Sequence, residues 1–269
     1  MSSQHVRLAT LRRMKEQKKR IVVLTAYDTP SARIADEAGV DIILVGDSLG
    51  NVVLGYDDTI PVTLSDMIHH TAAVARARPR ALIVGDMPFM TYKLSPEQAL
   101  ANCGRLVQEG GAQAVKLEGG AEIAPTVARV VEAGIPVMGH VGLTPQSIHQ
   151  LSGYRVQGRG DAERERMIRD ARALDAAGAF AIVIELAPRE TARAVTEAVS
   201  CPTIGIGAGP DTDGQVLVLH DMLGLGLSAP PKFVKAYANL REAMARAIET
   251  YCREVREGLY PSDKHSHGE

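Results

Sequence analysis

The fold is decided by the stretch from Pro96 to His140, which reads PEQALANCGRLVQEGGAQAVKLEGGAEIAPTVARVVEAGIPVMGH. It contains two amphipathic helical patterns, each followed by glycine and then by a short apolar run. Glycine adopts the left-handed conformation that ends a helix at little steric cost, so Gly110 and Gly134 are expected helix stops. Apolar runs without alternation are typical of strands buried on both faces of a parallel sheet. The stretch therefore predicts consecutive βαβ units.

The same pattern continues along the whole chain. The expected strands are Ile21–Thr25, Ile42–Gly46, Ala81–Gly85, Ala114–Leu117, Pro136–His140, Ala181–Ile184, Thr203–Ile206 and, less distinctly, Val216–Leu219. The expected helices include Ser31–Ala38, Pro96–Glu109, Ile123–Ala133, Asp161–Ala176 and Arg189–Val199. Strands that alternate with helices over 269 residues predict the α/β class and one closed (β/α)₈ TIM barrel. An open, doubly wound sheet is the alternative.

The domain organisation is expected to be simple. Residues 1–269 should form a single (β/α)₈ barrel domain, with residues 1–20 as a helical lead-in and residues 262–269 as a flexible tail. Val234–Arg256 should form a C-terminal helical extension, as one helix or a helix pair. Its apolar face either packs within the chain or contacts another subunit. His265 and His267 lie in the polar tail and are interpreted as solvated rather than as metal ligands.

The composition is that of an ordinary globular protein, with 45% hydrophobic residues, 23% charged residues and a net charge of −2. No global electrostatic feature therefore favours binding to nucleic acid or to a membrane. No apolar run approaches the ~20 residues that span a bilayer, and the N-terminus lacks the apolar core of a secretory signal. The three cysteines are widely spaced, which suits a reduced compartment. We expect a cytoplasmic location.

The lead-in is nevertheless basic, with Arg12, Arg13 and Lys15 among its charged residues. A nucleic-acid patch or a transit peptide has this composition. Leu8 and Leu11 lie at helical spacing and a strand follows directly, so we interpret the charges as the solvated face of a helix.

Polar residues follow the expected strands at the points where the strands end. In a barrel the C-terminal ends of all strands meet on one rim, where the active sites of this fold occur. We therefore expect one cluster that contains Asp47, Ser48, Asp86, Lys116, Glu118, His140 and Glu185.

Carboxylates that converge in this way repel one another and need a cation, a proton or strong donors. Lys116 supplies part of the compensation, and a divalent ion would supply more. Oxygen ligands suit Mg²⁺, so Asp47, Asp86 and Glu118 are candidate ligands, each beside a glycine that would let a ligand approach. The alternative is that these residues cap the helices that follow them.

Two further rim residues have two interpretations each. Glu185 ends an apolar run, where a poorly solvated carboxylate suits a general base, but it could equally be a salt-bridged residue without catalytic duty. His140 either orients substrate or forms hydrogen bonds within the rim. The glycine-rich run Gly205–Gly209 is too short for a dinucleotide fingerprint and indicates a tight loop.

Taken together, the motifs resemble the ketopantoate hydroxymethyltransferase family, from about Leu11 to Pro261 and in the family's order. Two segments depart from the family pattern: the stretch of Met90 and Thr91, and the histidine-bearing tail. Neither segment is expected to contact the site. The matching stretches are Leu24–Asp28, Val45–Gly50, Gly85–Phe89, Val115–Gly120, Gly139–Ser147, Gly205–Gly209 and His220–Gly224.

The resemblance implies a reaction in pantothenate biosynthesis. A one-carbon unit from 5,10-methylenetetrahydrofolate would be transferred to 3-methyl-2-oxobutanoate through a Mg²⁺-stabilised enolate, giving 2-dehydropantoate and tetrahydrofolate. By matching motifs, Asp47 and Asp86 would bind Mg²⁺, with Glu118 in the metal site directly or through water. Asp47, Ser48, Asp86 and Lys116 would contact the keto acid, and Glu185 would accept the proton. The resemblance also implies a homo-oligomer, expected to be a decamer.

Two other functions remain open from the residues alone. One is another Mg²⁺-dependent keto-acid lyase or mutase, because one barrel supports many reactions that share an enolate. The other is an inactive barrel that serves as a scaffold, although every expected site carboxylate is present. The residues that would contact folate are not identifiable from the sequence.

Overall fold

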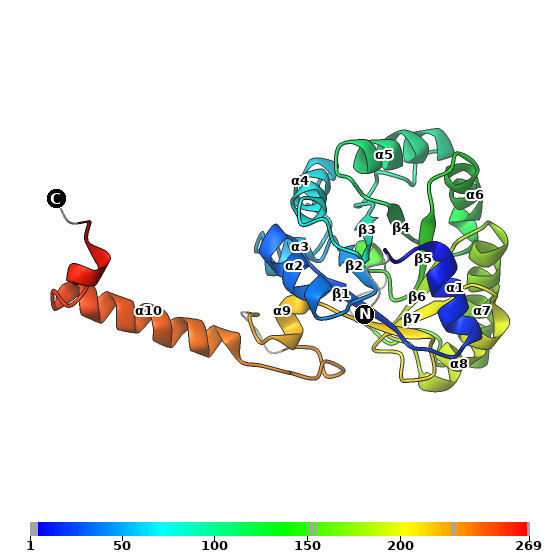
Figure 1. The fold of residues 1–269 in the computed structure, drawn as a ribbon. Helices are drawn as coiled ribbons and strands as arrows, with labels where there is room; N and C mark the ends of the chain where they lie inside the picture. Colours follow the sequence, from blue (N-terminus) through cyan, green and yellow to red (C-terminus); the bar gives the residue numbers. More distant parts are fainter. Residues whose placement is uncertain (1–4, 151–152, 154, 227–229, 268–269) are drawn as a thin grey trace. The chain divides into compact units, whose positions relative to one another are not determined.

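The computed structural model describes residues 5–150, 153, 155–226 and 230–267. Parallel strands close into a barrel in chain order, and β8 pairs with β1 (Figure 1). The closed barrel confirms the predicted fold class and excludes the open sheet. The strands are β1 (Ile21–Thr25), β2 (Ile42–Val45), β3 (Leu82–Asp86), β4 (Ala114–Glu118), β5 (Val137–Gly142), β6 (Ala181–Glu185), β7 (Thr203–Ile206) and β8 (Gly214–Leu217).

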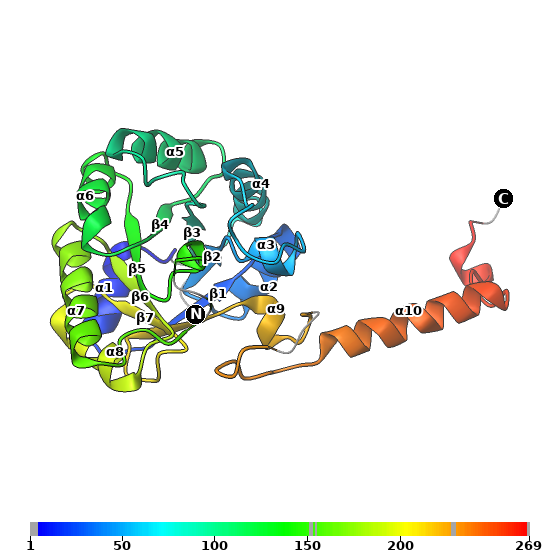
Figure 2. The ribbon, with the colours of Figure 1, turned by 180° about the vertical axis from the view of Figure 1, so that it is seen from behind.

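Helices surround the ring of strands, as Figures 1 and 2 show. The outer helices are α2 (Thr29–Glu37), α4 (Leu64–Ala75), α5 (Pro96–Gln108), α6 (Ala124–Glu132), α7 (Asp161–Ala176) and α8 (Arg189–Ala198). Shorter turns are α3 (Leu49–Val52), η1 (Ala121–Ile123) and η2 (Pro145–Ser147). Helix α4 was not among the expected helices. It begins with a capping box, in which the Thr63 hydroxyl accepts from the Asp66 amide at 3.1 Å and the Asp66 carboxylate accepts from the Thr63 amide at 2.9 Å.

When residues are grouped by their contacts in space, the protein divides into two compact units, Met1–Val218 and Leu219–Glu269. The first unit holds the barrel. The second holds α9 (Leu219–Met222), α10 (Leu240–Arg256) and η3 (Asp263–His265). The expected extension is a single helix, but its predicted start at Val234 is wrong, because the Asn239 side chain caps α10. Residues 268–269 of the predicted tail lie outside the described residues.

Alternation along the strands determines which side chains point into the barrel. In β4, Ala114 belongs to the apolar cluster inside the barrel, whereas Val115 and Leu117 belong to the cluster beneath the helices. Successive strand residues point to opposite faces, so Lys116 and Glu118 share the inward face of Ala114. The same alternation turns the terminal acidic residues of β3 and β6 inward.

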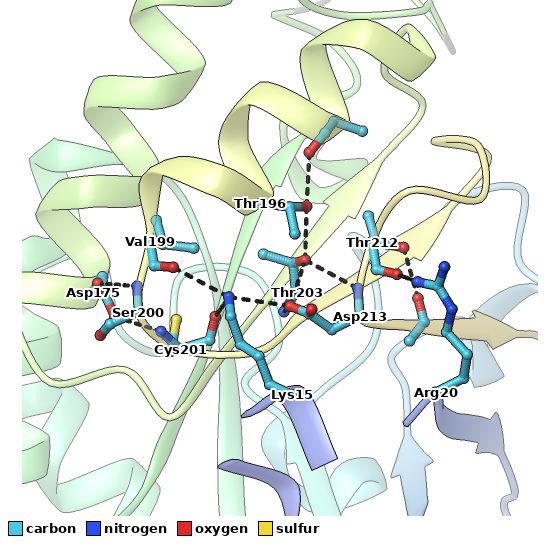
Figure 3. A network of polar contacts seen from close by, with 12 residues as sticks. Lys15, Arg20, Asp175, Thr196, Val199, Ser200, Cys201, Thr203, Thr212 and Asp213 are labelled. Atoms are coloured by element: carbon cyan, nitrogen blue, oxygen red, sulfur yellow. Dashed lines mark hydrogen bonds and ion pairs between the residues drawn. The ribbon is translucent and has the colours of Figure 1, made fainter. Parts of the chain in front are cut away.

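Helix α1 (Leu8–Glu16) closes the N-terminal end of the barrel. Leu11 is buried in the inner apolar cluster. The Lys15 ammonium donates to the carbonyl oxygens of Val199 at 3.1 Å and Cys201 at 2.7 Å, and it lies 3.2 Å from the Asp213 carboxylate (Figure 3). These acceptors precede β7 and β8. The lead-in is therefore helical, as expected, but the interpretation of its basic residues as a solvated face is wrong for Lys15, whose side chain is 20% exposed and binds the bottom of the barrel.

A neighbouring carboxylate orders the same end. Asp175 accepts hydrogen bonds from the main-chain amides of Ser200 at 2.7 Å and Cys201 at 3.0 Å (Figure 3). Burial acts to raise the pKa of Asp175, but these hydrogen bonds hold the pKa below its usual value. The carboxylate is therefore ionised near neutral pH and fixes the segment that leads into β7.

Lys15→Met tests this closure. The change leaves two carbonyl oxygens and the Asp213 carboxylate without their cation. We expect the free energy of unfolding, measured by urea denaturation, to fall by about 1–3 kcal/mol. The kcat should be unchanged because the site lies at the other end of the barrel. The matched control is Lys19→Met, an exposed lysine just beyond the helix; an equal loss in both variants would contradict the proposed closure.

Candidate active site

The structure brings all seven expected site residues to the C-terminal end of the barrel. Strand register sets the first contacts, because β3 and β4 pair through Asp86 and Lys116 and β4 and β5 pair through Glu118 and His140. Asp47 and Ser48 lie in the turn after β2, and Glu185 ends β6. Most of the cluster is almost fully buried, with exposed fractions of 4% for Asp47, 2% for Asp86, 5% for Lys116, 1% for Glu118 and 2% for His140.

The charged side chains form a line of alternating sign. The Lys116 Nζ lies 2.7 Å from Asp86 Oδ1 and 3.7 Å from Glu118 Oε1. His140 Nδ1 lies 3.4 Å from Glu118 Oε1, and His140 Nε2 lies 3.2 Å from Glu185 Oε2. One line of contacts thus links the acidic residue of β3 to that of β6. His140 thus contacts both carboxylates as an ion-pair partner, although neither ring nitrogen has hydrogen-bond geometry to them, and its contact with substrate stays a prediction.

Burial and neighbouring charges shift the ionisation of this line. Burial and Lys116 act to lower the pKa of His140, but Glu118 and Glu185 raise it to about 9. Burial also acts to lower the pKa of Lys116, which Asp86 and Glu118 hold above its usual value. Burial acts to raise the pKa of Glu118, but His140 and Lys116 hold it below its usual value. Both basic groups are therefore positively charged near neutral pH.

Asp47 and Asp86, on the other side of the cluster from Glu185, are less well compensated. Burial raises the pKa of Asp47 well above its usual value, and the charges of Asp86 and Glu118 raise it further. Burial also raises the pKa of Asp86, against the opposing effect of Lys116. The acidic side chains outnumber the basic ones, so this corner of the site attracts an additional positive charge.

The donor set fits a hard divalent cation. Asp47 and Asp86 offer oxygen ligands in a buried, negatively charged corner. Among the described residues, no group of three or more His, Cys, Asp or Glu side chains has the arrangement to hold a metal ion. Mg²⁺ commonly takes one or two protein carboxylates and completes its shell with substrate and water.

The helix-capping interpretation of the acidic residues is wrong. Asp47 Oδ2 accepts from the side chain of Gln146 at 2.8 Å, and Asp86 Oδ2 accepts from the main-chain amide of Asp47 at 3.0 Å. Helix α5, which follows Asp86, is capped by Ser95, and neither α3 after Asp47 nor η1 after Glu118 has a side-chain cap. The carboxylates are thus held by the site itself rather than by the helices that follow them.

The glycines beside Asp47 and Asp86 pack closely against protein atoms. A Cβ at Gly46 would lie 2.7 Å from Ser48 Oγ, and one at Gly85 would lie 2.9 Å from Leu106 Cδ2. These glycines admit close packing of the protein against itself, in the turn after β2 and beneath α5.

Three residues of the site were not identified from the sequence. Gln146 and Tyr92 are buried and hydrogen-bonded to the acidic cluster, and the Tyr27 hydroxyl lies 2.8 Å from Ser48 Oγ. Tyr92 follows Met90 and Thr91, the stretch that departs from the family pattern, and its hydroxyl accepts from the Glu118 amide at 3.1 Å. Gln146 lies within a matching stretch, which was the one available signal for it.

Comparison with known proteins assigns the chain to a family. The profile of the ketopantoate hydroxymethyltransferase family matches residues 5–263. The 3-methyl-2-oxobutanoate hydroxymethyltransferase of Moorella thermoacetica is 60% identical over 261 residues, which cover 97% of each chain. The chain belongs to the ketopantoate hydroxymethyltransferase family. A relative of the same name from a Thermoanaerobacter species is 57% identical and covers 96% of this chain and 94% of its own.

Membership of the ketopantoate hydroxymethyltransferase family identifies the chain as an enzyme and sets aside the scaffold interpretation. Solved structures with a similar fold include 2,3-dimethylmalate lyase, with a TM-score of 0.60 and 20% identity over 97% of this chain and 91% of that chain. At this identity the likeness is one of fold alone. Within the described residues, none of the helices is long and apolar enough to cross a membrane.

Lys116→Met tests the electrostatic centre of the site. The change leaves the buried carboxylates of Asp86 and Glu118 without their ammonium partner. Loss of one partner of a buried pair typically costs about 3–5 kcal/mol, and we expect a loss of this size by thermal unfolding. The control is Lys93→Met, an exposed lysine after β3. A loss in Lys116→Met no larger than in the control would show that the carboxylates do not depend on this charge.

Proposed function

We propose that this enzyme transfers a hydroxymethyl group from 5,10-methylenetetrahydrofolate to 3-methyl-2-oxobutanoate, giving 2-dehydropantoate and tetrahydrofolate. The observation that carries the proposal is the buried cluster of Asp47, Asp86, Lys116 and Glu118 in a chain whose relatives are named for this keto acid and this transfer. Its partners would be small molecules in the cytoplasm, a 2-keto acid and a reduced folate.

A divalent cation, Mg²⁺ in the simplest case, would be held by Asp47 and Asp86, with Glu118 as a direct or water-mediated ligand. Bound there, it would draw electron density from the keto and carboxylate oxygens of the substrate and make the hydrogen on C3 more acidic. The negative charge of this corner and its oxygen-only donors support the choice of ion.

Removal of the C3 proton is the difficult step, because C3 is a tertiary carbon activated only by the adjacent ketone. Glu185 would accept this proton, and a positioned base is typically worth ~10²–10⁴ in rate. His140 Nε2 lies 3.2 Å from the Glu185 carboxylate and would fix its orientation. The electron pair left by the proton moves to the keto oxygen as an enolate.

The remaining residues would bind and stabilise the keto acid. Lys116 carries a buried positive charge beside Asp86 and Glu118, and it would offset the charge of the substrate carboxylate or of the enolate. Ser48, held by the Tyr27 hydroxyl at 2.8 Å, would hydrogen-bond the substrate. The enolate then forms a carbon–carbon bond to the one-carbon unit, which leaves the folate, and water supplies the hydroxyl oxygen.

The enzyme is also proposed to form a homo-oligomer, with a decamer as the expected size. Support comes from α10, whose apolar residues Met244, Ile248 and Tyr251 are each more than half exposed. Exposed apolar faces of this kind commonly mark contacts between proteins. Light scattering after size-exclusion chromatography measures the size directly, and a monomer at micromolar concentration would refute the proposal.

The reaction is tested by following loss of 3-methyl-2-oxobutanoate with and without 5,10-methylenetetrahydrofolate, in the presence of Mg²⁺ or of EDTA. We expect consumption only with both folate and Mg²⁺ present. Consumption that is independent of folate would indicate a lyase or mutase instead, as would turnover of pyruvate or phosphoenolpyruvate.

Glu185→Gln tests the base. The variant keeps the size of the side chain but has no carboxylate to accept a proton. We expect exchange of the C3 hydrogen of 3-methyl-2-oxobutanoate for deuterium, measured by NMR, to fall by about 10²-fold or more. Mg²⁺ affinity should change little, because Glu185 is not among the proposed ligands. Exchange at the wild-type rate would mean that another group is the base.

A further inference from the structure

Gln146 occupies a buried position between the acidic residues, and both its side-chain nitrogen and its side-chain oxygen have hydrogen-bond partners. Its Nε2 donates to Asp47 Oδ2 at 2.8 Å and to the Met87 carbonyl oxygen at 2.9 Å. Its Oε1 lies 2.8 Å from the Tyr92 hydroxyl. The amide has only one satisfactory orientation, because the reverse orientation would place its oxygen against the Met87 carbonyl oxygen. The side chain is 2% exposed, so water is no substitute for these partners.

The main chain of the same residue holds a second carboxylate. The Gln146 amide donates to Glu118 Oε2 at 3.1 Å. Asp47 follows β2 and Glu118 ends β4, and these strands flank β3, which carries Asp86. One residue of the turn after β5 therefore connects the acidic groups on both sides of Asp86.

These contacts commit one oxygen of each carboxylate to the protein. Glu118 Oε1 remains turned toward Lys116 and His140. Asp47 Oδ1 accepts no hydrogen bond within the part of the chain that the structure describes, which leaves this atom available to a ligand. Hydrogen bonds to the second oxygen of a ligating carboxylate fix its orientation before the ion arrives, and the loss of such contacts typically weakens metal binding by 10–100-fold.

We propose that the Gln146 side chain is a positioning group that holds Asp47 in the orientation that receives a divalent cation. The inference rests on the metal site of the proposed function. It differs from a purely structural role, in which Gln146 would only fill space and satisfy buried polar groups. Tyr92 allows the two roles to be distinguished, because it belongs to the same hydrogen-bonded group but does not contact the Asp47 carboxylate.

The test compares Mn²⁺ affinity in three variants, with free Mn²⁺ measured by electron paramagnetic resonance and no substrate present. Gln146→Met keeps the length of the side chain and removes both donors. Gln146→Asn keeps an amide that is one methylene too short to reach Asp47, and it decides the question if the first variant fails to fold. Tyr92→Phe, the matched control, leaves the Gln146 donors in place and removes the hydroxyl that faces its carbonyl oxygen.

We expect Mn²⁺ to bind about tenfold more weakly, or weaker still, to both Gln146 variants. Tyr92→Phe should bind it nearly as the wild type does, although its thermal stability without metal should also fall. Wild-type Mn²⁺ affinity in a folded Gln146 variant would overturn the inference. An equal loss of affinity in Tyr92→Phe would also overturn it, because general loosening would then explain both.

The wild type separates this inference from the proposed function. If it binds Mn²⁺ and converts the keto acid only with folate, unchanged affinity in the Gln146 variants refutes the positioning role alone. If it shows no saturable Mn²⁺ binding, the metal part of the proposed function fails and the inference fails with it.

Discussion

The site depends on one buried positive charge, the ammonium of Lys116, which lies between the carboxylates that β3 and β4 bring together. Its distance of 2.7 Å from Asp86 is set by the pairing of these residues across adjacent strands. Transfer of several carboxylates out of water is costly, and like charges at short range add to that cost. The barrel offsets part of this cost by fixing Lys116, and beside it His140, among the carboxylates. Burial of the cluster lowers the stability of the fold, but it also strengthens the electrostatic interaction of these charges with a bound molecule.

The two ends of the barrel use lysine in contrasting ways. At the N-terminal end, Lys15 meets two carbonyl oxygens and one carboxylate, so its donors are well satisfied. At the C-terminal end, Lys116 is outnumbered by acidic groups, and burial together with the charges of Asp86 and Glu118 raises the pKa of Asp47. Lys15 stabilises the fold. The acidic groups around Lys116 carry a local excess of negative charge, which a bound cation can neutralise.

Much of the barrel could be predicted because its strands are uninterrupted apolar runs between helices that end in glycine. β1 and β7 were predicted with the bounds that the structure has. β8 was predicted two residues late, because Gly214 and Gln215 lack apolar character although they form its start. The convergence of Asp47, Asp86, Lys116 and Glu118 followed from the fold, since every strand end reaches the same rim.

What could not be predicted depends on contacts between distant segments. Gln146 lies on a short 3₁₀ turn without periodicity, and its partners are far away in the sequence. Tyr92 follows a stretch that departs from the family pattern, yet its hydroxyl contacts the main chain of Glu118. The packing of Leu106 against Gly85 is likewise a contact between distant segments that only coordinates show.

Differences in burial within the site fit a division of roles. The Asp86, Lys116 and Glu118 side chains are only 2–5% exposed, whereas the Glu185 side chain is 14% exposed. A group that binds a cation or holds a fixed charge benefits from exclusion of water, because its interactions are screened less. A base must also release its proton after each turnover, so contact with solvent is an advantage there. His140 connects these two regions through its two ring nitrogens, so the orientation of the proposed base depends on the same buried charges that would hold the substrate.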